Sequence, residues 1–184
     1  MEASVKTIAQ FLEIYGNGVL WQSLRAICDR PHHELRVEHP FVDVGEAKFL
    51  EESSLGASVM EPGAIAPTDR MAHFCGRGRK WRFLKVYDRR IVKDYRTEAN
   101  IFVAHFVRQS IRQCRDYSEI AAENPELARE CEALRDILAR LNAVWAGLMP
   151  EFKYVQLKQI PLANPLLQFD PRYHVVLESW NAGF

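Results

Sequence analysis

The sequence lacks the features that mark membrane, secreted or strongly charged proteins. None of its apolar runs approaches the roughly 20 residues that a membrane-spanning helix needs. Its polar N-terminus, with Glu2 early, does not resemble a signal peptide. The 24 lysines and arginines equal the 24 aspartates and glutamates, so no overall field draws the protein to nucleic acid or anionic lipid. We expect a cytoplasmic globular protein without membrane association, in which any attraction for an anionic partner comes from a local patch.

Signatures of common enzyme chemistry are missing as well. The chain has no Gly-x-Ser-x-Gly elbow, no glycine-rich phosphate loop ending in lysine and serine or threonine, and no dinucleotide fingerprint. The six histidines lack the spacing of a zinc site. The four cysteines have no paired short spacing, which is typical of reduced, core-filling thiols: Cys28, Cys75, Cys114 and Cys131. We therefore predict no cofactor and no metal for this chain.

The dominant positive feature is an apolar repeat in the second half of the chain. Its members alternate at spacings of four and three, which keeps one narrow stripe of a helix facing a partner. The stripe consists of Leu127, Cys131, Leu134, Leu138, Leu141, Trp145 and Leu148. A preceding helix, starting at Thr97, has an apolar face of Phe102, Val103, Phe106, Val107, Ser110, Cys114 and Tyr117. We predict a long antiparallel helix pair over residues 97–148.

The remaining segments predict shorter elements around this pair. Helices are expected at residues 5–15, at 19–29 and from Asp170 onward, the first two forming an antiparallel hairpin. Extended segments are expected within 34–44, within 80–95 as a hairpin turning at 88–90, and at 152–160, with a connector at 53–68. The predicted fold is α+β and predominantly helical.

Two unequal lobes are the expected domain organisation. Residues 1–68 hold the helical hairpin and the short extended segments, and residues 69–184 hold the basic hairpin, the long helix pair and the C-terminal helix. A single domain is the alternative, since 184 residues with 48% hydrophobic content can bury one substantial core.

A basic and aromatic stretch is the leading candidate for a binding site. Lysine and arginine neutralise phosphates, glycines allow close approach of the backbone, and tryptophan offers a face on which a base can stack. The candidate nucleic-acid-binding residues are Arg77, Arg79, Lys80, Trp81, Arg82, Lys85, Arg89, Arg90 and Lys93. The alternative is a solvated loop that runs into a hairpin with a wet basic face.

Two short matches to a metal-dependent nuclease motif give an enzymatic alternative. Such a core needs an acid on one strand and an acid-x-lysine on the next, where the acids hold Mg²⁺ and lysine steadies water or phosphate. Glu46 with Lys48 and Glu151 with Lys153 match the second half of this pattern. A third hypothesis, without catalysis, is a homodimer formed through the stripe on residues 127–148.

Three segments carry a resemblance to a known family. In the first segment, residues 26–32 (AICDRPH), the end of a helix contains isoleucine and is followed by proline-histidine. The residues LRVE follow at 35–38. Residues 95–103 (YRTEANIFV) look like the family's aspartate-threonine-proline-glutamate-asparagine before an apolar helix. Residues 164–173 (NPLLQFDPRY) look like its NPxLxxDPxY segment before a tryptophan, here Trp180. On these segments the chain resembles the restriction-endonuclease-like proteins related to McrC.

The resemblance implies a binding module rather than an enzyme. In the family a PD-(D/E)XK nuclease core follows the matched region, so the resemblance implies an N-terminal, non-catalytic portion of a restriction or phage-defence nuclease, with Mg²⁺ needed only by that core. Such portions dock onto a ring-forming, nucleotide-hydrolysing McrB-like motor subunit and help position DNA. This chain departs from the family at Arg96, where aspartate is usual, and at Glu98 and Ala99, which replace proline-glutamate.

Overall fold

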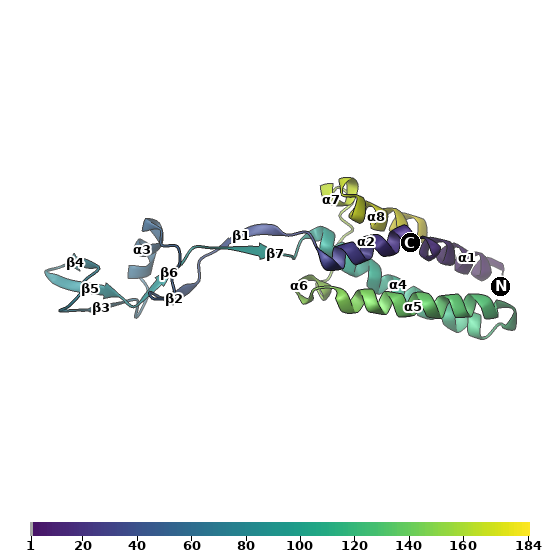
Figure 1. Cartoon of the computed structure of the whole chain (residues 1–184), viewed down its shortest axis with the longest axis horizontal. Coiled ribbons are helices and arrows are strands. Elements are labelled where there is room, and N and C mark those ends of the chain that lie inside the picture. The colour runs from purple at the N-terminus through teal and green to yellow at the C-terminus, as the bar shows by residue number, and fades with distance from the viewer. Residues whose placement is uncertain (1) are drawn as a thin grey trace. The chain divides into compact units, whose positions relative to one another are not determined.

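The computed structural model describes residues 2–184 and has the predicted α+β, predominantly helical fold (Figure 1). The chain forms two compact units: unit 1 contains the residues up to His33 and those from Tyr95 to Phe184, and unit 2 is Glu34–Asp94. This division differs from the lobes predicted at 1–68 and 69–184, because the strands that follow residue 33 pair with strands that precede residue 95. Unit 2 is therefore an insertion between two helices of unit 1.

Helices account for all the regular structure of unit 1 within residues 2–184. They are α1 (Glu2–Gly16), α2 (Gly18–Asp29), α4 (Glu98–Ala122), the 3₁₀ helix η1 (Pro125–Leu127), α5 (Ala128–Gly147), α6 (Pro150–Lys153), α7 (Pro165–Phe169) and α8 (Pro171–Gly183). The Thr97 side chain accepts from the Asn100 amide at the start of α4, and Asp170 accepts from Arg172 at the start of α8. Across this same range, no helix is both long and apolar enough to cross a membrane.

The predicted pairing of α4 with α5 is confirmed and forms the centre of the unit 1 core. Phe102 and Phe106 on α4 are fully buried, as are Leu134 and Leu141 on α5. The Tyr15 hydroxyl donates to Ser110 on α4 and so joins α1 to the same core. The stripe on α5 is thus occupied within its own chain, and a homodimer through it would require this core to open.

Two predictions within unit 1 are wrong. Helices α1 and α2 form no antiparallel hairpin, because only Asn17 separates them and one residue cannot reverse the chain; α2 runs on from α1 (Figure 1) and packs mainly on α8. The strand predicted at 152–160 is absent as well. Pro150 opens the short helix α6, which buries Phe152, and the residues from 155 to 164 form no regular element.

Unit 2 consists of short antiparallel strands and one helix. The elements are β1 (Glu34–Glu38), β2 (Phe41–Asp43), α3 (Glu52–Val59), β3 (Ile65–Pro67), β4 (Phe74–Gly76), β5 (Arg79–Phe83), β6 (Lys85–Tyr87) and β7 (Arg90–Asp94). Strand β1 pairs with β7, β2 pairs with β6, and β5 lies between β3 and β4. The first strand of unit 2 pairs with its last and the second strand pairs with the second to last, so the pairs enclose one another along the chain. Within unit 2, the innermost sheet, β3-β5-β4, therefore lies at the end opposite β1 and β7 (Figure 1).

The sequence predicted strands in unit 2 but not their partners. The hairpin expected to turn at 88–90 is wrong, because β6 and β7 pair with β2 and β1 instead of with each other. The connector expected at 53–68 contains most of α3 and all of β3. The tight hairpin of this unit is formed by β4 and β5, whose two-residue loop is Arg77 and Gly78.

Candidate nucleic-acid interface

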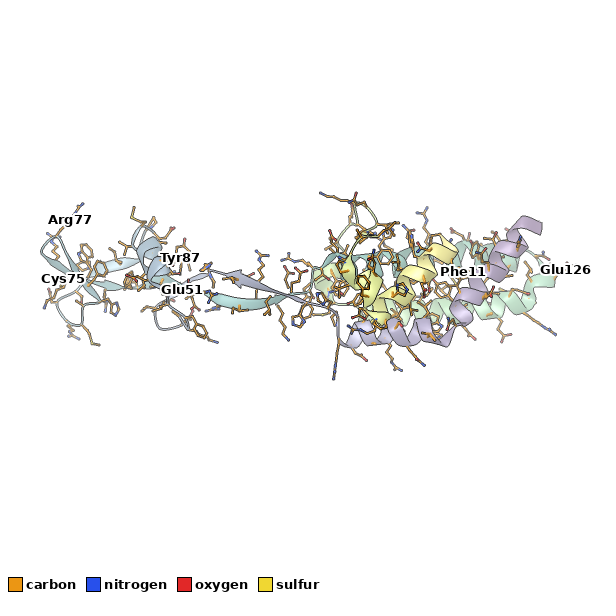
Figure 2. All side chains as sticks on the ribbon, turned by 90° about the horizontal axis from the view of Figure 1, so that it is seen from above. Phe11, Glu51, Cys75, Arg77, Tyr87 and Glu126 are labelled. Carbon is orange, nitrogen blue, oxygen red and sulfur yellow. The ribbon has the colours of Figure 1, made fainter. Side chains whose placement is uncertain are left out.

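The loop between β4 and β5 has the geometry of a tight hairpin turn. Arg77 has a φ of 50° and Gly78 a φ of 73°. Positive φ at both central residues is typical of a type I′ turn, whose twist matches that of the flanking strands. Glycine adopts this conformation without strain, whereas Arg77 is the one non-glycine residue in residues 2–184 with a positive φ. The turn places the Arg77 side chain at the end of unit 2, near Cys75 (Figure 2).

Strand β5 sends its side chains alternately to two faces of the sheet. Directly opposite residues of an antiparallel pair share a face, and Gly76 lies opposite Arg79 while Cys75 lies opposite Lys80. Face one therefore carries Arg79, Trp81 and Phe83, and face two carries Lys80 and Arg82. Face two is lined on the neighbouring strands by the small residues Ala66 and Cys75.

Four exposed cations gather on this hairpin, and we call them the hairpin cluster: Arg77, Arg79, Lys80 and Arg82. None of the four forms an ion pair within residues 2–184. Asp69 is the one acidic residue between positions 64 and 84, and it lines a shallow depression with Thr68, Arg79 and Lys80. The cluster is therefore a local source of positive potential on a chain of zero net charge.

Trp81 supports the hairpin more than it offers a free stacking platform. Its indole Nε1 donates to the Gly76 carbonyl oxygen across 3.3 Å. It lies opposite Phe74 on one neighbouring strand and Pro67 on the other, and its side chain is half-buried. The ring is thus part of the small apolar layer on face one, beside Phe83.

The other predicted contact residues lie outside the β3-β5-β4 sheet, and two of them, Arg89 and Arg90, form ion pairs. Arg89 Nε lies 3.1 Å from Glu51 Oε1, and Arg90 Nε lies 2.7 Å from Asp88 Oδ2. Lys85 and Lys93 are exposed but lie opposite Asp43 and Leu35, respectively, in the β2–β6 and β1–β7 pairs. The structure therefore brings together the cluster and Trp81, and separates them from Lys85, Arg89, Arg90 and Lys93.

Asp88 binds Arg90 and also holds the backbone at Lys48 and Phe49. This residue was not identified from the sequence. Its side chain is fully buried and accepts hydrogen bonds from the backbone amides of Lys48 (3.0 Å) and Phe49 (2.7 Å). The hydrogen bond from Arg90, together with those from the Phe49 and Lys48 amides, lowers the pKa of Asp88 below its usual value. Since two of these donors lie about forty residues away in the chain, sequence spacing carries no sign of the arrangement.

The two acid-x-lysine matches lie outside the strands. Glu46 and Lys48 lie in a turn after β2, and the Lys48 amide is engaged by Asp88. Glu151 and Lys153 lie in the short helix α6, where Lys153 Nζ is 4.9 Å from the centre of the Trp145 ring. The motif requires its acid-x-lysine pair to lie on a strand, and neither of these pairs does.

A buried polar cluster in unit 1 joins segments that are far apart in the chain. Asn100 Nδ2 donates to the carbonyl oxygens of His32 and Tyr95, both at 2.7 Å. The Tyr173 hydroxyl donates to Asn100 Oδ1 at 2.5 Å and accepts from the His32 amide at 2.9 Å. Arg172, held by Asp170, donates to the Arg30 carbonyl. Burial raises the pKa of Tyr173, so its hydroxyl stays a donor.

This cluster brings together all three segments on which the McrC-like resemblance rests, at His32, at Tyr95 and Asn100, and at Tyr173. The motifs thus have a common structural explanation, which is the anchoring of the chain on both sides of unit 2. Comparison with known proteins adds no relative, since no protein-family model, no curated protein and no solved structure matches this chain.

Proposed function

We propose that this chain is a non-catalytic, DNA-binding module of an McrC-like restriction or phage-defence system. The observation that carries the proposal is the hairpin cluster, whose four cations are exposed and form no ion pair with any residue in the range 2–184. Cations of this kind neutralise DNA phosphates and release condensed counterions, which favours binding and makes it sensitive to salt. Since the whole chain has no net charge, attraction to DNA has to come from a local patch such as this one.

The test is a salt series with a triple variant, Arg79→Ala, Lys80→Ala and Arg82→Ala. Affinity for a mixed-sequence 20-base-pair DNA is measured by fluorescence anisotropy with the full chain. We expect weak binding by the parent, and a slope of log affinity against log salt that falls by up to about 2.7, about 0.9 for each lost phosphate contact.

A second triple variant controls for the loss of three charges. Arg108, Arg112 and Arg115 are exposed on α4 of unit 1, and their replacement by alanine changes the net charge by the same amount. This control should keep the parental affinity and slope. If the hairpin variant binds DNA as well as the parent at every salt concentration, the proposed function is wrong.

The motor subunit is the second partner that we propose, on the strength of the resemblance alone. The three segments that carry the resemblance meet at Asn100 in unit 1. Adding the chain to an McrB-like motor subunit should change the rate of nucleotide hydrolysis. A rate that stays constant up to saturating amounts of the chain removes this partner from the proposal.

The absence of activity is proposed for this chain and is tested with plasmid DNA. Incubation with Mg²⁺ or Mn²⁺ should leave supercoiled plasmid uncut, since neither acid-x-lysine pair lies on a strand. Cleavage that disappears in Lys48→Ala or Lys153→Ala would show that the chain is a minimal nuclease instead.

A further inference from the structure

The hairpin cluster has an arrangement that restricts how it can meet a nucleic acid. Arg79 lies on face one of the sheet, Lys80 and Arg82 lie on face two, and Arg77 lies in the turn between the strands. Strand β5 supplies all three of the strand residues, so the two sets of charges are separated only by the thickness of the sheet.

Contact with a flat surface or with one extended strand would use the charges of one face only. If face two met the phosphates, Arg79 would point away from them, and if face one met them, Lys80 and Arg82 would point away. Both faces are engaged together when the hairpin enters a groove that has phosphates along both walls. The two strands of a duplex provide such a groove.

The dimensions of the hairpin fit the major groove of B-form DNA. This groove, about 12 Å wide and about 8.5 Å deep, admits a two-stranded β-ribbon. The minor groove, at about 6 Å, is too narrow for a sheet with basic side chains on both faces. The A-form RNA major groove is deep and narrow, and excludes protein side chains.

We propose that the β4–β5 hairpin inserts into the major groove of double-stranded DNA, with Arg79 contacting the phosphates of one strand and Lys80 and Arg82 those of the other. Arg77 leads into the groove from the turn. This inference rests on the proposed function and names its substrate class, which is duplex DNA in preference to single strands and to duplex RNA.

The experiment compares one arginine from each face of the same strand. Arg79→Ala and Arg82→Ala are matched, because both residues are exposed and both lie on β5, and Arg108→Ala on α4 is the control. Each protein is titrated against a 20-base-pair DNA duplex, one of its single strands and the RNA duplex of the same sequence, from 50 to 200 mM salt. Far-UV circular dichroism verifies that each variant is folded.

If the hairpin inserts, each of the two hairpin variants should lower the slope of log affinity against log salt by about 0.9. Between 50 and 200 mM salt, this corresponds to a loss of affinity about 3.5-fold smaller than that of the parent. The double variant should lower the slope by about 1.8. Arg108→Ala should leave the slope unchanged. The DNA duplex should bind more tightly than the single strand and the RNA duplex, and netropsin, which fills the minor groove, should not compete.

Three outcomes overturn the insertion while leaving the proposed function in place. They are a change of slope in only one of the two hairpin variants, equal affinity for the single strand or the RNA duplex, and competition by netropsin. No change of slope in either variant, or no DNA binding by the parent, overturns the proposed function and the insertion together.

Discussion

Units 1 and 2 are stabilised by different means. The helices of unit 1 share one hydrophobic core, in which large side chains such as Phe102, Phe106 and Leu141 are fully buried. Among the described residues of unit 2, the buried apolar side chains are Ala64, Phe83 and Val86. Isolated ribbons of two short strands are marginally stable in water, and every residue of β1 is exposed.

Polar contacts add to the few buried apolar side chains of unit 2. The Ser58 hydroxyl donates to the Ser54 carbonyl and accepts from the Tyr87 amide, which fixes α3 on β6. Asp88 binds the amides that precede α3. Unit 1 therefore supplies the stability of the chain, whereas unit 2 uses backbone pairing to hold a basic hairpin in water.

The largest effect is expected from opening a cavity in the unit 1 core. Leu141→Ala removes a fully buried side chain of α5 from the unit 1 core and should lower the free energy of unfolding by about 2–5 kcal/mol. Urea unfolding followed by circular dichroism measures this loss. Val86→Ala in unit 2 is the comparison, and should leave the helical signal and its midpoint almost unchanged. An equal loss in both variants would show that the units unfold as one and would break the contrast.

A smaller loss is expected from the buried polar cluster. Asn100→Ala leaves the carbonyl oxygens of His32 and Tyr95 and the Tyr173 hydroxyl without their partner, and should lower the free energy of unfolding by about 1–3 kcal/mol. Tyr173→Phe, which removes one hydroxyl and keeps the ring, should cost less. Urea midpoints equal to that of the parent in Asn100→Ala would mean that the cluster does not anchor unit 1.

Acid should affect unit 2 through Asp88. Because its pKa is lowered in the folded state, the stabilisation by its charge is present above the unfolded value of about 3.9 and is lost as the pH falls through the folded value. The amide NMR signal of Phe49, which binds Asp88, should therefore change below about pH 4 while signals of α4 persist. Asp88→Asn should weaken Phe49 protection at neutral pH as well. Unchanged protection in this variant would contradict the role of the charge.

The smallest effect is a difference in thiol reactivity. Cys75 on β4 is exposed, whereas Cys114 is buried on α4 and its burial raises the thiol pKa to about 11. A thiol reagent at pH 8 should modify Cys75 rapidly and Cys114 only after unfolding, because the thiolate is the reactive form. Mass spectrometry of timed samples measures the order. Early modification of Cys114 would show that the unit 1 core opens readily.

Sequence patterns predicted the helices of unit 1 well and the pairing of unit 2 badly, and the reason is physical. The stripe through Leu134 and Leu141 repeats over five turns, so its direction toward a partner is specified locally. A strand of three residues, such as Lys85–Tyr87, specifies two faces but not a partner. Its partner is set by the nested return of the chain, which brings Phe41 opposite Tyr87 across more than forty residues.

The candidate interface was predictable in part for the same reason. The charges of the hairpin cluster and a flanking glycine are adjacent in the sequence, so they could be grouped without knowledge of the strand pairing. The pairing of Arg89 with Glu51 was not predictable, because it depends on where the chain returns after α3. Sequence reasoning therefore included Arg89 and Arg90 among the contact residues, whereas the structure places both in ion pairs.

The two ends of unit 2 lie next to each other in the first pair of the β1–β7 register. Glu34 lies opposite Asp94, so the chain enters and leaves unit 2 at points whose Cα atoms are about 4.5–5.5 Å apart. On the unit 1 side, the rings of His33 and Tyr95 are centred 5.6 Å apart. A two-residue loop can span such a gap, so residues 34–94 can be replaced by a short loop or by another inserted domain. A chain that carries Gly-Gly in place of residues 34–94 should keep the helical circular dichroism of unit 1 and lack the DNA binding that we propose for the hairpin cluster.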